Sequence, residues 1–275
     1  MKIHAGFRLG LECTQPTPML LVLNLHPSRR IDLLTEQNLT FDQPIDAWTY
    51  TDTFGIVAPA GVTTIASDFE VYDTGQPDIV PVDAVQHAIQ DLPDNVLQFL
   101  LGSRYCDTDR LSDFAWENFS ETPLGWARVQ AICDFVHNHI AFDYLKADAL
   151  RTAHGGFTER TGVCRDFAHL AITLCRCMNI PARYCTGYLG DIGVPPVPDP
   201  MDFSAWFEVY LGGHWHTVDA RHNAPRIGRI LMATGRDATD VAISTSFGPT
   251  KLVEFSVVTE EVAENAAQAA SQAYA

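Results

Sequence analysis

The chain has 275 residues, of which 47% are hydrophobic and 19% charged, and its formal net charge is −16. These values are typical of a globular protein with a substantial core, arranged as one large domain or two smaller ones. A surface this acidic repels nucleic acid and anionic lipid, so we expect neither a nucleic acid nor a membrane as partner. The seven cysteines show no disulfide-framework spacing, and no apolar run typical of a signal peptide follows the N-terminus. The sequence therefore predicts reduced thiols and a cytoplasmic location.

The first 75 or so residues alternate partly between apolar and polar side chains, which predicts short β-strands separated by Pro, Gly, Asp and Asn. The predicted strands cover residues 2–12, 19–26, 47–52 and 63–73. A proline and a Gly-Gln-Pro sequence interrupt this pattern at 75–81. The strand-rich part of the chain is therefore expected to end there.

The middle of the chain changes to a helical spacing of apolar residues. Residues 83–106 predict two helical pieces around Pro93, and residues 123–144 predict a longer helix that begins after Pro123. Residues 164–178 predict another helix. Helices are thus grouped together and do not alternate with the strands.

The strand pattern returns after Pro181, at 182–190, 203–220, 239–247 and 251–262. Gly212 and Gly213 separate two alternating runs within 203–220, which predicts a β-hairpin. Strands grouped on both sides of a helical segment indicate an α+β fold with a mostly antiparallel sheet.

Three segments follow from this order of elements. We predict an N-terminal β-rich domain at 1–78 and a core at 79–262. The last segment, 263–275, is rich in alanine and polar residues, and a frayed helix or disorder is expected there.

One cysteine lies at the predicted start of a helix. Cys164 follows the sequence Thr161-Gly162-Val163, and the apolar residues after it repeat at the spacing of one helical face. Unpaired amide groups and the helix dipole at such a position favour a thiolate, which is the nucleophilic form of cysteine. The same amides can stabilise an oxyanion on an attacked amide. The alternative is a structural role, since free cysteines are among the most buried residues.

The sequence around this helix resembles the bacterial transglutaminase-like proteins, which are relatives of the papain-like thiol enzymes. The resemblance is carried by "TGVCRDFAHLAITLCRCMNIPARYCTGYL" and "AWFEVYLGGHWHTVDARHN", within residues 161–222. It extends less specifically over nearly the whole chain, to a subgroup with an N-terminal β domain. It implies a papain/transglutaminase-like core, in which a cysteine-bearing helix packs against an antiparallel sheet.

The resemblance also implies a chemistry. The family cleaves or transfers acyl groups at peptide or side-chain amides through a thioester, and this chemistry requires no metal and no other cofactor. Carried over to this chain, Cys164 is the nucleophile and Asp219 is the carboxylate that orients the base. A peptide or protein is the implied substrate, and the oligomeric state is left open.

The chain departs from the family at the position of the base. The family's catalytic histidine directly precedes Ala-Trp, and this chain has Ser204 there. Serine cannot act as a base near neutral pH. Three explanations remain open: another histidine replaces the base, the enzyme works by a weakened mechanism in which Ser204 holds a water, or the protein is a catalytically inactive binding or scaffold protein.

Histidines near the motif are the candidates for a replacement. His222 leads, because it lies three residues after Asp219, where a turn can bring it back to the sulfur. His169 points about 140° away from Cys164 around the helix. His214 and His216 share a strand face opposite to that of Asp219.

One further residue is a candidate for the substrate cleft. Trp206 has the same strand parity as Ser204, so we predict that it either lines the cleft and binds substrate or fills the core.

Overall fold

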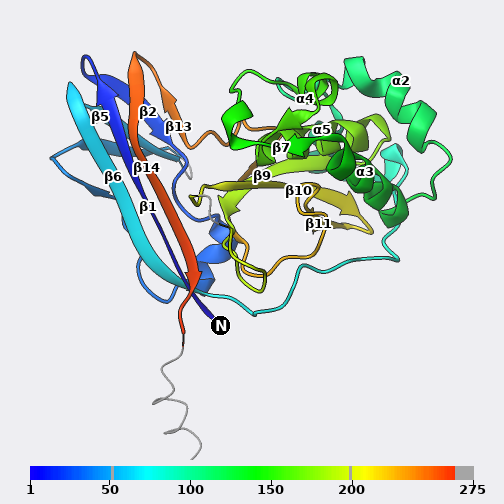
Figure 1. The fold of residues 1–275 in the computed structure, drawn as a ribbon, viewed down its shortest axis with the longest axis horizontal. Coiled ribbons are helices and arrows are strands. Elements are labelled where there is room, and N and C mark those ends of the chain that lie inside the picture. The colour runs from blue at the N-terminus through cyan, green and yellow to red at the C-terminus, as the bar shows by residue number, and fades with distance from the viewer. Residues whose placement is uncertain (51–52, 198–199, 264–275) are drawn as a thin grey trace, which may run out of the picture.

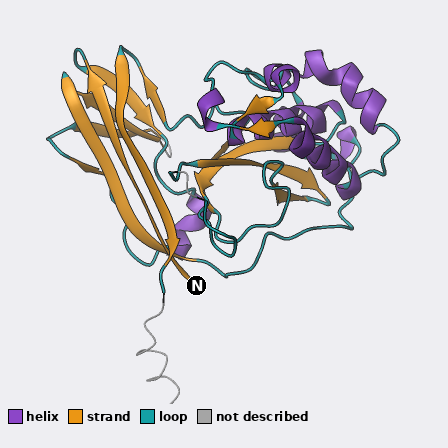
Figure 2. Cartoon of the chain, in the orientation of Figure 1, coloured by secondary structure: helices purple, strands orange, loops and turns teal. Residues whose placement is uncertain are grey.

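The computed structural model describes residues 1–50, 53–197 and 200–263. Its elements form a strand-rich sandwich and a mixed region of helices and strands that lie beside each other (Figure 1). Figure 2 shows that the longer helices gather in the mixed region. The predicted α+β class is confirmed.

The sandwich has two four-stranded antiparallel sheets, ordered β14-β1-β6-β3 and β13-β2-β5-β4. Its strands are β1 (Lys2–Cys13), β2 (Thr17–Leu21), β3 (Thr40–Phe41), β4 (Asp46–Tyr50), β5 (Thr53–Ala58), β6 (Gly61–Tyr72), β13 (Ser244–Ser246) and β14 (Thr250–Glu261), with a 3₁₀ helix η1 (Pro27–Asp32). Alternate residues of β1, such as Ile3, Phe7 and Leu9, are buried, which explains the period-two pattern of the sequence.

The mixed region contains one antiparallel sheet, ordered β11-β10-β9-β12. The four strands of this sheet are β9 (Ala182–Tyr188), β10 (Ser204–Leu211), β11 (His214–Val218) and β12 (Ile230–Gly235). The mixed region also contains β7 (Ala141–Phe142) and β8 (Thr161–Gly162), which form a separate parallel pair. Its α-helices are α1 (Asp94–Leu97), α2 (Thr108–Phe119), α3 (Trp126–His139), α4 (Ala153–Glu159) and α5 (Cys164–Cys177), and its 3₁₀ helices are η2 (Ile89–Asp91), η3 (Gln98–Leu100) and η4 (Tyr144–Lys146).

Helix α5 is the centre of the mixed region. It packs against β9 and β10 on one side and against α2, α3 and α4 on the others, so that every residue from Asp166 to Cys177 is buried. The predicted helix at 164–178 is confirmed. Asp166 fixes the start of the helix, because its Oδ2 accepts the Val163 N–H at 2.8 Å. This contact holds the first turn, and therefore Cys164, in place.

The predicted hairpin is also confirmed, between β10 and β11. Gly212 and Gly213 connect the two strands with φ angles of 58° and 85°, a left-handed conformation that glycine adopts at low cost. The hairpin aligns the start of β10 with the end of β11. Ser204 and Asp219 are consequently brought to the same end of the sheet.

The middle and the end of the chain differ from the sequence prediction. Residues 83–106 form only η2, α1 and η3, whereas α2 and α4 were not predicted. The division at 79–262 assigned the last strands to the core, but β13 and β14 pair with β2 and β1 of the sandwich. The first and last parts of the chain therefore build the sandwich together. The predicted tail at 263–275 lies, except for its first residue, outside the described residues.

The two regions share a hydrophobic core. Tyr188 and Phe203 of the mixed region pack among the buried side chains of the sandwich. The ring centroids of Tyr188 and Phe69 are 5.7 Å apart, and those of Phe203 and Phe7 are 5.8 Å apart. Because Phe203 directly precedes Ser204, this contact ties the sandwich to the edge of the candidate site.

Candidate active site

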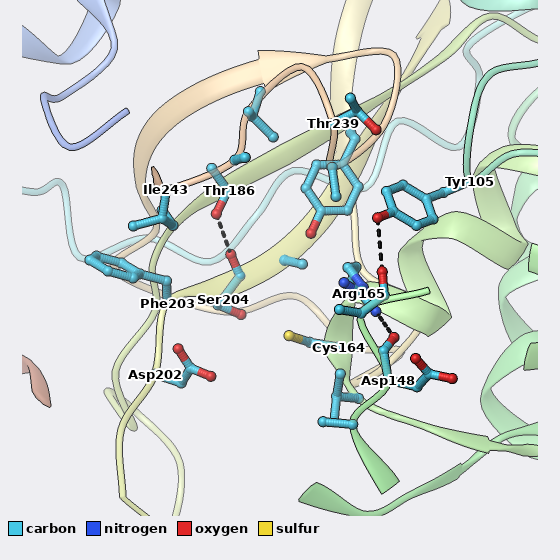
Figure 3. A pocket seen from close by; sticks show the side chains of 18 of the residues that line it. Tyr105, Asp148, Cys164, Arg165, Thr186, Asp202, Phe203, Ser204, Thr239 and Ile243 are labelled. Carbon is cyan, nitrogen blue, oxygen red and sulfur yellow. Dashed lines mark hydrogen bonds between the residues drawn. The ribbon is translucent and has the colours of Figure 1, made fainter. Parts of the chain in front are cut away.

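Cys164 is the first residue of α5 and the one cysteine of the seven that is partly exposed, the other six being buried. Its side chain borders a cleft. Figure 3 shows the sulfur pointing to the side on which Ser204 and Asp202 lie. The other six cysteines are buried, as a structural role requires. The structure thus singles out Cys164 as the thiol that a substrate can reach.

The environment of this thiol differs from the one that the sequence suggested. Burial of the sulfur by the surrounding protein raises the pKa of Cys164 to about 11. The charge of Arg221 and the N–H of Ala205 act in the opposite direction without offsetting this effect. Desolvation thus outweighs the effect of the helix start, and the raised pKa favours the neutral thiol in the free protein instead of the expected thiolate.

A histidine and a carboxylate form a fixed pair beside the same cleft. His222 Nδ1 lies 2.8 Å from Asp219 Oδ2, and Arg229 Nη2 donates to that oxygen at 2.9 Å. Asp219 is buried, which opposes its ionisation, but Arg229 and then the hydrogen bonds from His222 hold its pKa well below the usual range. Asp219 is thus a carboxylate that accepts from His222 Nδ1–H and leaves Nε2 as the ring nitrogen that can accept a proton.

The chain after β11 folds so that this pair forms. Asp219 Oδ1 accepts the N–H groups of Arg221 and His222 at 2.9 and 3.0 Å, and the Asn223 N–H bonds back to the Asp219 carbonyl. Asn223 has a φ of 49° and also receives a hydrogen bond from Gln130 of α3. This turn, which the spacing of three residues predicted, returns the His222 ring to Asp219.

Two cavities meet at the thiol. The first, of about 660 Å³, lies between the mixed region and β13 and β14 of the sandwich. The second, of about 360 Å³, lies beneath the Pro-rich loop before β10 and includes His222. Cys164, Asp202, Phe203 and Ser204 line both. The nucleophile candidate therefore sits at the junction of two spaces, and His222 borders the same cavity as its sulfur.

Ser204 occupies the position of the family's histidine at the first residue of β10. It pairs with Gly187 of β9, and its carbonyl accepts from Thr186 Oγ1 at 3.3 Å (Figure 3). Its own Oγ is buried and has no hydrogen-bond partner among the described residues. A buried hydroxyl without a partner is costly, so this group is a natural contact for water or substrate.

The other histidine candidates lie away from this arrangement. His169 is fully buried between the rings of Tyr105 and Tyr184, and burial lowers its pKa to about 3. Its Nε2 accepts the N–H of Ala238 at 3.2 Å. His214 is exposed, and neither it nor His216 lines the two cavities at Cys164. Of the four candidates, only His222 combines the carboxylate contact with the shared cavity.

Trp206 does not lie in the cleft. Its side chain is 2% exposed and lines neither cavity, which corrects the prediction of a substrate contact. The guanidinium of Arg229 lies 5.1 Å from its ring centroid. Trp206 therefore packs against the arginine that holds Asp219, and it supports the site from the core side.

Sequence reasoning missed two residues that border the thiol. Arg221 lines the second cavity, and its guanidinium lies 3.8 Å from the ring centroid of Phe142. Asp202 lines both cavities, and burial raises its pKa. The sequence could have indicated both residues, because Arg221 lies between Asp219 and His222 and Asp202 lies two residues before Ser204. Residues that neighbour a motif commonly line the same cleft.

The described ranges 1–50, 53–197 and 200–263 hold no group of three or more His, Cys, Asp or Glu side chains placed to bind a metal ion. Within the same ranges, no helix has both the length and the apolar character needed to cross a membrane.

Comparison with known proteins identifies the fold of this site. Residues 116–220, which include α3, α5 and β9–β11, match the family model of the transglutaminase-like superfamily. This part of the chain is a transglutaminase-like domain, and the resemblance noted in the sequence is confirmed.

The similarity to one crystal structure extends far beyond this domain. That structure, of a "putative cysteine protease" from Cytophaga hutchinsonii, has 28% identity and a TM-score of 0.82 and covers 96% of this chain and 92% of its own. An uncharacterized protein of Mycobacterium leprae is 37% identical over 83 residues. That match spans only 30% of each chain.

Proposed function

We propose that this protein is a thiol enzyme that cleaves or transfers acyl groups at peptide or side-chain amides, with Cys164 as nucleophile and His222 as base. One observation carries the proposal: His222 is held by Asp219 through Nδ1 and borders the cavity that also contains Cys164. A nucleophile, a base and a group that orients the base define a triad by geometry, whatever their order in the chain. His222 would take the role of the family's histidine, whose position in this chain is occupied by Ser204.

The proposed reaction begins with a neutral thiol. As Cys164 Sγ attacks the amide carbon, its proton passes to His222 Nε2, and the negative charge moves to the amide oxygen. The first amide groups of α5 have no partners within the helix and are the donors available to that oxyanion. The amine then leaves with the proton from His222, and a thioester remains on Cys164. Water or a second amine resolves it, with His222 again accepting a proton.

The two cavities support an extended substrate. An amide held at Cys164 has room for chain on both sides, in the first and in the second cavity. A peptide or protein segment fits this shape better than a small compact molecule. The same geometry accommodates hydrolysis and transfer, since either water or an amine can approach from the second cavity. The Ser204 hydroxyl would contact the substrate or a bound water.

A second candidate is a binding or scaffold protein that keeps the transglutaminase-like fold. Two observations favour it: the serine at position 204 and the raised pKa of Cys164. Both would be tolerated in a cleft that binds a peptide without attacking it. The two candidates differ in whether a covalent intermediate forms.

A mass-spectrometric trap of the acyl-enzyme separates them. Incubation with a peptide library is expected to add acyl masses to Cys164 and to release amines. His222→Ala should slow both by about 10²–10⁴-fold, because a general base typically contributes that much. His214→Ala is the matched control, because His214 is exposed at the start of β11 and lines neither cavity, and this variant should react like the wild type. Equal rates in the two variants would remove His222 from the mechanism, and no adduct in any protein would favour the scaffold.

We also keep the cytoplasmic location as part of the proposal. All seven cysteines are free, including the buried ones, which suits a reducing compartment.

A further inference from the structure

Two arginines line the first cavity without a carboxylate partner among the described residues. Many arginines of the chain lie within 4.0 Å of an acidic oxygen, namely Arg8, Arg29, Arg151, Arg183, Arg226, Arg229 and Arg236. Arg104 and Arg165 have no such contact with any described residue, although both border the cavity at Cys164. In a chain with a formal net charge of −16, acidic partners are plentiful. Two arginines that line one cavity without an acidic partner in the described structure are therefore available to bind an anion.

Arg165 is only partly satisfied. Its Nη2 donates to the carbonyl of Asp148, and its Nε is buried without an acceptor among the described residues. A buried donor without an acceptor is costly unless a ligand or water completes it. Arg165 and Cys164 line the same cavity, and Figure 3 shows their side chains near each other.

The ring of Tyr105 holds both arginines. The guanidinium carbons of Arg104 and Arg165 lie 5.2 and 5.4 Å from its centroid. Tyr105 is itself fixed, because its hydroxyl donates to the Ala149 carbonyl at 2.8 Å and its ring stacks on His169 at 5.0 Å. The two cations are thus pre-organised on a rigid support, which lowers the entropic cost of binding an anion.

The acidic residues of this cavity do not neutralise that end. Asp148 Oδ1 accepts the N–H of Leu150 at 2.8 Å and makes no ion pair with Arg165 within the described chain. Asp202 lies at the junction of the two cavities, beside Cys164. Near the sulfur the charge of Asp202 is opposed by that of Arg221, whereas Arg104 and Arg165 supply two positive charges against the one carboxylate of Asp148 in the lining. An anion would therefore be directed to the two arginines.

We propose that the first cavity is a carboxylate-binding subsite, in which Arg104 and Arg165 select an acyl substrate that carries a negative charge near the attacked amide. Guanidinium groups bind carboxylates through paired charge-assisted hydrogen bonds. The apolar side chains of Val241, Ile243 and Phe255 in the same lining would contact the carbon chain of the substrate. The carboxylate is that of an acidic side chain or of a free chain end. As a statement about substrates, this inference rests on the proposed function.

Alkylation of Cys164 by matched probes tests the subsite without turnover. N-iodoacetyl-glutamic acid α-amide and N-iodoacetyl-glutamine α-amide differ only in the side-chain charge. N-iodoacetyl-glycine and its amide test a terminal carboxylate. At one pH, the ratio of acid to amide rates at Cys164 cancels the ionisation of the thiol. We expect a ratio of about 10 for at least one pair, from ordinary charge-assisted binding, and the pair that shows it identifies the source of the carboxylate.

Variants assign the ratio to the two arginines. The double variant Arg104→Gln/Arg165→Gln should lower the acid-to-amide ratio to the value measured for a small free thiol. Arg110 is an exposed arginine of α2 outside both cavities, so Arg110→Gln should leave the ratio unchanged. If the double variant does not fold, the single variant Arg104→Gln, at an exposed residue, should still lower the ratio about threefold. An equal ratio in wild type and variant overturns the subsite. Because alkylation needs only the thiol, an inactive protein with a high ratio would instead contradict the proposed function alone.

Discussion

The two halves of the candidate site are built in opposite ways. In the His222–Asp219–Arg229 half, both partners of Asp219 are held to its carboxylate by hydrogen bonds, and this carboxylate is ionised despite its burial. The half that contains Cys164 and Ser204 is desolvated, with a raised thiol pKa and a hydroxyl without a partner in the described structure. The orienting groups are thus in place before substrate arrives, whereas the reacting groups are left for the substrate to complete.

This difference explains how a thiol at a helix start can be neutral. The helix amides favour an anion, but their effect is small compared with the removal of water from the sulfur. In the proposed mechanism the base takes the proton only during attack. A nucleophile of this kind is protected from oxidation while it rests, because the thiolate is the reactive form.

The largest expected effect comes from breaking the ordered half. Asp219→Asn removes the acceptor that fixes His222 and one of the two carboxylates paired with Arg229. We expect a loss of about 10⁴-fold in kcat/KM, as for other triads whose carboxylate is replaced. The free energy of unfolding should fall by about 3 kcal/mol, because a buried charge loses a partner.

Steady-state kinetics and urea unfolding measure the two effects. Asp240→Asn, which breaks the exposed pair with Arg236, is the matched control and should cost less than about 1 kcal/mol. A variant at Asp219 with full activity and full stability would show that the ordered half is not part of the site.

The sequence predicted the elements whose pattern is local. The apolar stripe after Cys164 indicated α5, and Gly212–Gly213 indicated the hairpin, because both signals depend on neighbouring residues. The pairing of β14 with β1 depends on segments about 250 residues apart, and no local pattern reports it. This is why the predicted division of the chain placed the last strands in the wrong region.

The site was predictable to a similar extent. The family resemblance indicated Cys164 and Asp219, and a spacing of three residues indicated the turn that carries His222. The pKa of Cys164 could not be read in this way, because it depends on how tightly Ala205 and the residues around it enclose the sulfur. The sequence also could not decide whether Trp206 is buried or lines the cleft. Strand parity shows on which face of the sheet a side chain lies, but not what covers that face.

A smaller effect concerns the pH dependence of the desolvated half. With a pKa of about 11, the thiolate fraction of Cys164 grows about tenfold per pH unit through the neutral and mildly alkaline range. Alkylation of Cys164 by iodoacetamide should therefore keep rising between pH 7 and 10, beyond the point where an exposed thiol levels off. Arg221→Gln should raise the pKa further and slow labelling at pH 8 about threefold, because it removes the charge that favours the thiolate.

Mass-spectrometric labelling rates measure this profile, with Arg110→Gln as the control for an arginine outside the cleft. A plateau of reactivity between pH 6 and 7 would contradict the neutral thiol and indicate a standing ion pair with an imidazolium.

The smallest expected effect tests the partnerless hydroxyl. Ser204→Ala removes a buried oxygen that makes no hydrogen bond in the described structure, so the free energy of unfolding should stay the same or rise by up to about 1 kcal/mol. Thermal or urea unfolding measures this, and Thr186→Val, which removes the donor to the Ser204 carbonyl, is the contrasting variant and should be destabilised. A clear loss of stability in Ser204→Ala would mean that the hydroxyl holds an ordered water. If stability is kept while turnover falls, the hydroxyl acts on the substrate, and the desolvated half is then completed only in the complex.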